Sequence, residues 1–130
     1  VVCHQSITTL LEDATHVAIA IPWLDREGKP QAGIITETEI KSLRFPAIIV
    51  SASVPRIFSP EALTLMNQLG KENKTLVRID TAQRRAEEFK PLYPHIKFAH
   101  NEAFASPRCQ EALDNAMLEK ARKFFNKRLN

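Results

Sequence analysis

The sequence predicts an α/β fold, Rossmann-like, with a small, mostly parallel sheet flanked by helices. Short apolar runs of strand length alternate with segments of helical periodicity along the whole chain. Ser or Thr residues suited to N-capping precede several of the helical segments. The 130 residues are 44% hydrophobic, enough to bury one core, so we expect a single domain over residues 1–130.

The first two elements are a helix and a strand. Ser6 is suited to cap a helix over residues 7–14. Residues 17–21 form a continuous apolar run, which is typical of a strand covered on both faces of a parallel sheet. Pro22 ends this strand, and a polar loop follows over residues 25–31.

A capping box predicts the next helix, and an apolar run predicts the second strand. Thr36 is followed three residues later by Glu39, the spacing at which each side chain bonds the backbone of the other residue. The helix is expected to span about two turns and to end before Pro46. Residues 47–50 are all apolar and are expected to form a second buried strand.

The middle of the chain predicts a longer helix and a third strand. Ser59 and Pro60 supply an N-cap and a first helical residue, and the helix is expected to end at Gly70 as a left-handed C-cap. Residues 75–79 alternate more than the earlier runs, which favours a strand near the edge of the sheet.

The last third predicts a short strand and a final helix. Residues 81–94 are polar and contain two prolines, which indicates a loop or a loose helix, and residues 96–98 are a candidate fourth strand. The final helix begins at Pro107. Its buried side is expected to carry Leu113, Met117, Phe124 and Phe125.

Charge and composition exclude several classes of function. The net charge is +3, with 5 Lys/Arg and 7 Asp/Glu before residue 71 and 13 and 8 from residue 71 onward. Nucleic-acid binding is not expected, because no aromatic platform is interleaved with these cations. No apolar run approaches the roughly 20 residues of a membrane span. The two cysteines are far apart, which argues against a zinc site or disulfide framework and favours a reducing cytoplasm.

Four segments carry a resemblance to a known family. Residues 10–22 are similar to a Leu-Leu, Ala-Asp-Val-Val, apolar strand, Pro segment, and residues 43–50 to the strand before an Asn-Thr-Ser-Arg-Gly turn. Residues 59–63 match the start of the following helix, and residues 98–100 occupy the position of a Thr-Pro-His sequence. In this order they resemble the C-terminal part of the NAD-binding domain of the D-2-hydroxyacid dehydrogenase family.

The resemblance implies an NAD(P)-dependent oxidoreductase that acts on a 2-hydroxy or 2-keto acid. His100 would be the acid/base residue, or Asn101 if the alignment shifts by one position, and its partner would be Glu87 or Glu88. NAD or NADP would be the cofactor. The residues lining it would be Pro22, Ser51, Ala52, Ser53 and Asp80.

Each of these roles has a structural alternative. Ser51 and Ser53 either line a cofactor pocket or satisfy local backbone groups. Asp80 either caps a strand end or contacts the nicotinamide ribose or amide. His100 is otherwise a polar residue at a strand-to-helix corner.

The chain also departs from the family pattern. It has three glycines and no Gly-x-Gly-x-x-Gly sequence to hold a pyrophosphate, and Val54 stands where the family has its substrate-binding arginine, with Arg56 two positions later. We therefore expect a truncated or divergent member that is inactive as this isolated chain and needs a missing N-terminal segment or a homodimer to complete it. The alternative is a non-catalytic Rossmann-like module for interaction or regulation.

Overall fold

The structure is a computed structural model that describes residues 6–100 and 107–129 and divides into two compact units, residues 1–100 and residues 101–130. The described part of the second unit is one long helix. The elements in chain order are α1 (Ile7–Leu11), β1 (His16–Ile19), α2 (Glu37–Lys41), β2 (Ala47–Ser51), the 3₁₀ helix η1 (Pro55–Ile57), α3 (Pro60–Lys71), β3 (Thr75–Asp80), α4 (Gln83–Phe89), β4 (Lys97–Ala99) and α6 (Pro107–Leu129).

The first unit is built on a four-stranded sheet in which every pair of neighbouring strands is parallel. This confirms the predicted α/β class with a small Rossmann-like sheet. The strand order is β1-β2-β3-β4, so β3 lies inside the sheet and the expectation that it is near an edge is wrong. Its alternating sequence has another cause, because one face of this strand is buried and the other is exposed.

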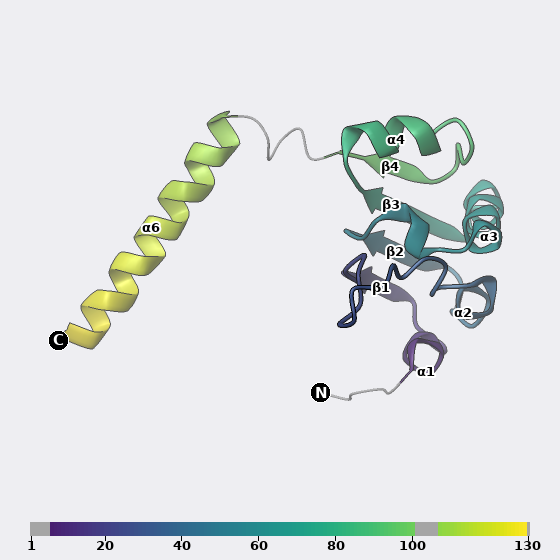
Figure 1. The fold of residues 1–130 in the computed structure, drawn as a ribbon, viewed down its shortest axis with the longest axis horizontal. Helices are drawn as coiled ribbons and strands as arrows, with labels where there is room; N and C mark the ends of the chain where they lie inside the picture. The colour runs from purple at the N-terminus through teal and green to yellow at the C-terminus, as the bar shows by residue number, and fades with distance from the viewer. Residues whose placement is uncertain (1–5, 101–106, 130) are drawn as a thin grey trace. The chain divides into compact units, whose positions relative to one another are not determined.

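The helices of this unit cover one face of the sheet. Right-handed crossovers that advance in a single direction place their helices on the same side, and Figure 1 shows α1, α2 and α3 along one side of the strands. The covered face carries Ile49, Val77, Ile79 and Phe98, each at most 2% exposed. These residues join side chains from the helices in one hydrophobic core.

The opposite face of the sheet is exposed among the described residues. Ile48, Val50 and Leu76 are 39%, 42% and 67% exposed, respectively. Ile48 and Leu76 are partners in the β2–β3 register, so their side chains are neighbours on this face. The apolar run of β2 predicted burial on both faces, and in the described part of the chain only one face is covered. We call Ile48, Val50 and Leu76 the exposed sheet patch.

Several element ends follow the predicted signals, and two do not. The backbone N–H of Thr36 donates to Glu39 Oε2 at 2.7 Å, which confirms the capping box. Helix α1 is shorter than predicted, and Asp13 beyond it has a left-handed φ of 58°. Helix α3 continues past Gly70 to Lys71, and the left-handed residue that follows it is Asn73, with φ 57°.

Position 70 requires glycine because the backbone of His95 passes very close to it, and not because of its φ angle. A Cβ atom at this position would lie 2.7 Å from the backbone oxygen of His95, closer than real Cβ contacts. The segment before β4 therefore passes directly against the last turn of α3. The predicted C-cap role is wrong, because the glycine serves packing between two elements.

The predicted loop or loose helix over residues 81–94 contains α4. Phe89 at its end packs its ring 5.6 Å from that of Phe98, between centroids. This contact closes the core over β4.

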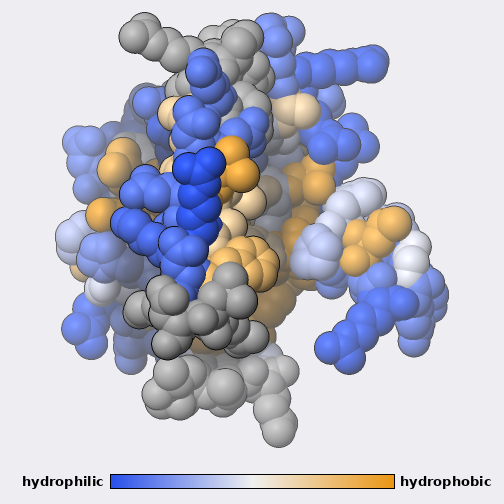
Figure 2. All heavy atoms as spheres, turned by 90° about the vertical axis from the view of Figure 1, so that its left-hand side faces the viewer, coloured by the Kyte–Doolittle hydropathy of each residue, from blue (hydrophilic) through white to orange (hydrophobic). Residues whose placement is uncertain are grey.

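Helix α6 differs from its prediction. Met117, Phe124 and Phe125 are 69%, 51% and 59% exposed, so the expectation that they are buried is wrong for this structure, while the side chain of Leu113 lies outside the described part. On the face drawn in Figure 2, hydrophilic side chains predominate among the coloured residues, and hydrophobic side chains gather in smaller areas. Among residues 6–100 and 107–129, no helix has the length and apolarity needed to span a membrane.

Candidate functional site

The carboxyl ends of the strands bring the predicted site residues to one edge of the sheet. Because all four strands are parallel, their carboxyl ends share that edge. Ser51 ends β2 and Asp80 ends β3, while Pro22 and His100 follow β1 and β4 closely. Ligands of open α/β sheets bind outside this carboxyl edge. Asn101, the alternative to His100, lies outside the described residues.

Ser51 and Ser53 organise the turn after β2. Ser53 Oγ accepts a hydrogen bond from the backbone N–H of Ile21 at 2.6 Å, and Ser51 Oγ accepts one from the N–H of Ser53 at 3.2 Å. Their exposed fractions are 0% for Ser51 and 4% for Ser53. Both hydroxyls therefore satisfy backbone groups, Ser51 within its own turn and Ser53 on the segment that follows β1.

Ala52 is the exposed residue of this turn. Its backbone N–H donates to the carbonyl oxygen of Ile19 at 2.9 Å, and its side chain is exposed. Ala52 is thus accessible to a ligand, whereas the serines on either side of it are buried. A small residue leaves room for a ligand to approach.

Asp80 is paired with a neighbour on its own strand. Its Oδ1 accepts a hydrogen bond from Arg78 Nε at 2.9 Å, and its side chain is 23% exposed. This side chain lies on the same face of the sheet as the exposed sheet patch, because residues two apart in a strand share a face. In this structure the carboxylate of Asp80 forms an ion pair with the guanidinium of Arg78.

The two candidate acidic partners lie on α4. Glu87 Oε1 accepts a hydrogen bond from Gln83 Nε2 at 3.1 Å, and Glu88 Oε1 lies 3.6 Å from an Nη atom of Arg56. The partly buried His100 follows β4. The structure thus joins Glu88 to the arginine that stands two positions beyond the family's arginine site, a pairing that sequence reasoning did not predict.

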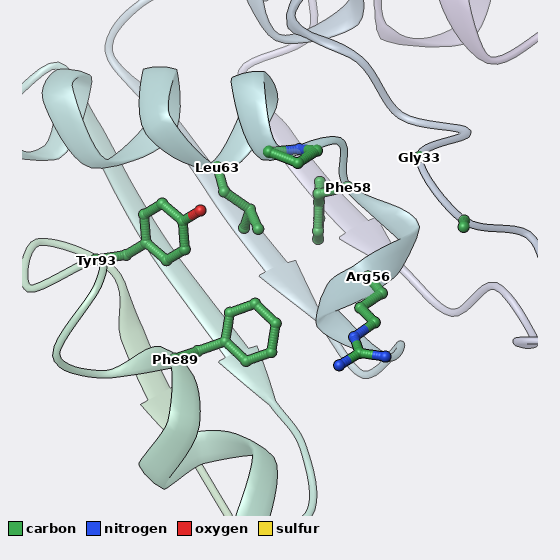
Figure 3. Close-up of a pocket in the computed structure, with 8 residues that line it drawn as sticks. Gly33, Arg56, Phe58, Leu63, Phe89 and Tyr93 are labelled. Atoms are coloured by element: carbon green, nitrogen blue, oxygen red, sulfur yellow. The ribbon is translucent and has the colours of Figure 1, made fainter.

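Arg56 and Glu88 lie beside an apolar groove of about 470 Å³. Figure 3 shows the rings of Phe89 and Tyr93 facing Leu63, with Arg56 near one end. The groove is lined by Ala32, Gly33, Arg56, Phe58, Pro60, Leu63, Phe89 and Tyr93. Such a groove suits an apolar or aromatic group, and the guanidinium suits a carboxylate.

The groove is the feature that sequence reasoning missed. Residues 81–94 were expected to be a loop or loose helix, so Phe89 and Tyr93 were not predicted as a wall. Their spacing of four residues was a weak signal, because α4 ends at Phe89 and Tyr93 lies in the irregular segment after it. The stacking of their rings, with centroids 6.3 Å apart, continues this wall beyond the end of α4.

Across residues 6–100 and 107–129, no three His, Cys, Asp or Glu side chains are clustered in a way that would hold a metal ion.

Comparisons with known proteins give no further assignment. No family model matches the chain, and neither the curated proteins nor the solved structures yield a significant match.

Proposed function

We propose that this chain is a divergent member of the D-2-hydroxyacid dehydrogenase-like, NAD(P)-dependent oxidoreductases, and that the carboxyl edge of its sheet contacts the nicotinamide half of the cofactor. One observation carries the proposal: the ends of four parallel strands bring Pro22, the Ser51–Ser53 turn, Asp80 and His100 to one edge. The exposed methyl group of Ala52 supports the approach of a flat ring there.

The residues fit one half of a dinucleotide better than the other. The 130 residues hold no glycine-rich turn to cradle a pyrophosphate. The four strands of the described sheet also lie side by side in sequence order. Dinucleotide cofactors bind where the strand order of such a sheet reverses, and the described sheet has no such point. We therefore propose contact with the nicotinamide end only, and no turnover by this chain alone.

In an active enzyme of this kind, His100 is the proposed acid/base residue. The cofactor supplies hydride chemistry when bound, and the imidazole exchanges a proton with the oxygen of a 2-hydroxy or 2-keto acid. Glu87 and Glu88 remain the candidate partners for its charge. Arg56 is the proposed contact for the substrate carboxylate, which would compete with Glu88 for the guanidinium.

Calorimetric titration of NADH into the purified chain tests this proposal. We expect a Kd in the millimolar range, because only part of the cofactor is contacted. Ala52→Trp fills the exposed position of the turn, and we expect it to weaken binding about tenfold or more. His100→Ala is expected to weaken it by a smaller factor.

Lys74→Trp is the matched control, because it adds the same ring just before β3, at the amino end of the strands. It is expected to leave the Kd unchanged. Absence of saturable heat, or equal binding by Ala52→Trp and the unsubstituted chain, would contradict the proposal.

A second candidate function is a non-catalytic module for interaction or regulation. The exposed sheet patch favours it, because contiguous apolar side chains at a protein surface are typical of contact sites. This function predicts no oxidation of NADH with any 2-keto acid, even when a separate glycine-rich dinucleotide-binding segment is supplied. Turnover that is lost in His100→Ala would exclude it.

A further inference from the structure

The groove beside Arg56 has walls that are fixed by the core and by the backbone. Phe58 and Leu63 are 2% and 3% exposed and belong to the hydrophobic core, so their side chains are held in place. The backbone N–H of Gly33 donates to the carbonyl oxygen of Arg56 at 2.9 Å, which ties one rim of the groove to η1. A groove with fixed walls needs little rearrangement to take up a ligand.

The lining of this groove suits an aromatic ring. Arg56 and Tyr93 carry its only polar side-chain groups. Figure 3 shows the rings of Phe89 and Tyr93 across from Leu63, so a flat ring placed between them would contact aromatic side chains and an aliphatic one. The volume of about 470 Å³ lies within the range of roughly 300–1,000 Å³ that is typical of small-molecule sites.

Arg56 supplies a positive charge at one end of the groove. An Nη atom of its guanidinium lies 3.6 Å from Glu88 Oε1, farther than the roughly 2.7–2.9 Å of a charge-assisted hydrogen bond. The two side chains are 63% and 53% exposed, and ion pairs with such exposure contribute little stability. A ligand carboxylate can therefore replace Glu88 and accept two hydrogen bonds from the planar guanidinium.

We propose that the groove binds a small aromatic carboxylate, with its ring against Phe89 and Tyr93 and its carboxylate on Arg56 in place of Glu88. This binding rests on the groove alone and needs no cofactor, so it can be tested apart from the proposed reaction. Only the further step, that the bound carboxylate is also the substrate, rests on the proposed function.

Calorimetric titration of the intact chain with indole-3-acetate, in the absence of NADH, tests this binding. We expect a Kd below about 1 mM, and about tenfold weaker binding of indole-3-acetamide, which has the same ring without the charge. Acetate, which lacks the ring, is expected to give no saturable heat up to about 10 mM. Equal binding of the acid and the amide, or binding of acetate as tight as that of indole-3-acetate, would overturn the proposal.

Two substitutions test the exchange of carboxylates on Arg56. Arg56→Gln is expected to weaken binding of indole-3-acetate about tenfold and to leave that of indole-3-acetamide unchanged, so that the preference for the acid disappears. Glu88→Gln removes the competing carboxylate and is expected to tighten binding of the acid about twofold to fivefold, the range for an exposed ion pair.

Arg44→Gln is the matched control for the lost charge, because Arg44 is exposed and precedes β2 at the amino end of the strand. It is expected to leave both Kd values unchanged. Equal weakening by Arg44→Gln and Arg56→Gln would overturn the proposal, as would weaker binding of the acid by Glu88→Gln.

A third substitution fills the groove from its rim. Ala32 is exposed and lines the groove, so Ala32→Trp is expected to abolish binding of the acid and of the amide without disturbing the core. Lys29→Trp adds the same ring in the same loop, at a residue that does not line the groove, and is expected to preserve binding. Circular dichroism checks that both variants are folded. Undiminished binding by folded Ala32→Trp would place the ligand elsewhere and overturn the proposal.

Parallel titrations with indole-3-acetate and with NADH separate the two proposals. Saturable binding of NADH without binding of indole-3-acetate would overturn this inference and leave the proposed function standing. Binding of indole-3-acetate that depends on Arg56, without binding of NADH, would support this inference and contradict the proposed function.

Discussion

Glu39 shows how a single buried acid fixes the start of a helix. It is 9% exposed and accepts hydrogen bonds from Thr36 and from Thr8 Oγ1, the latter at 3.0 Å. Burial opposes its charge, but these hydrogen bonds outweigh burial and lower the pKa of the carboxyl below 4.5. The contact with Thr8 also ties α1 to α2.

Glu39→Gln is expected to lower the free energy of unfolding by about 1 kcal/mol at pH 7, because glutamine is neutral and has one acceptor oxygen where Glu39 uses two. The pKa of Glu39 is lower in the folded chain, so its stabilisation is complete above 4.5 and is lost as the pH falls further. Urea denaturation at pH 7 and pH 3 measures the difference between variant and parent, which should shrink at pH 3.

Glu37→Gln is the control, since this exposed acid of the same turn pairs with Lys41 at 3.4 Å. It is expected to change stability by at most about 0.5 kcal/mol at either pH. An undiminished effect of Glu39→Gln at pH 3 would show that the ionised carboxylate is not the source of the stabilisation.

Gly70 gives a second test at the residue scale. Alanine is favoured over glycine in a helix by about 1 kcal/mol, but its Cβ would lie 2.7 Å from the backbone oxygen of His95. We expect Gly70→Ala to destabilise the fold by about 1–3 kcal/mol, the range of overpacking. Thermal unfolding compares it with Thr64→Ala, at an exposed position of α3. A gain of stability in Gly70→Ala would contradict the close approach.

Local sequence predicted the capping box because both partners lie within one turn. It misassigned Gly70 because the constraint comes from a segment 25 positions away, near His95, which only the tertiary structure brings close. Sequence signals therefore identify contacts within an element and miss those between elements.

At the scale of elements, two adjacent residues of β2 point to opposite faces of the sheet, one covered by helices and the other exposed. Ile49 is 1% exposed and Ile48 is 39% exposed. We expect Ile49→Ala to cost about 2–5 kcal/mol of unfolding free energy. Ile48→Ala should cost about 1 kcal/mol or less, since its side chain keeps much of its contact with water. Chemical denaturation of both variants measures the difference. Equal large losses would show that the exposed sheet patch is covered in solution.

The elements themselves were largely predictable, and their environments were not. The apolar runs at residues 17–21 and 47–50 indicated strands correctly, because side-chain type decides strand formation locally. Which faces are covered depends on the topology, and within residues 6–100 the sequential strand order leaves one face of the sheet without helices. The exposure of Met117, Phe124 and Phe125 on α6 was not predicted for the same reason. Helical periodicity identifies the apolar side of a helix but not whether another element packs against it.

For the whole molecule, parallel strand direction links the fold to the proposed function. It sets Pro22, the turn after β2, Asp80 and His100 on one edge, and these are residues that the family resemblance names for the cofactor and the acid/base role. The groove beside Arg56 was not predictable in this way, because its walls come from α3, η1 and the end of α4. Their meeting depends on packing over the sheet.

The location of NADH on the folded chain tests the central claim most directly. Backbone amide chemical shifts of the isotope-labelled chain should be followed by NMR during titration with NADH. We predict saturable shifts for Ala52, Ser53, Asp80 and His100 at the carboxyl edge, and none for Lys74 and Thr75 at the amino edge. Shifts confined to other parts of the chain, or no saturable shifts at millimolar NADH, would contradict the account.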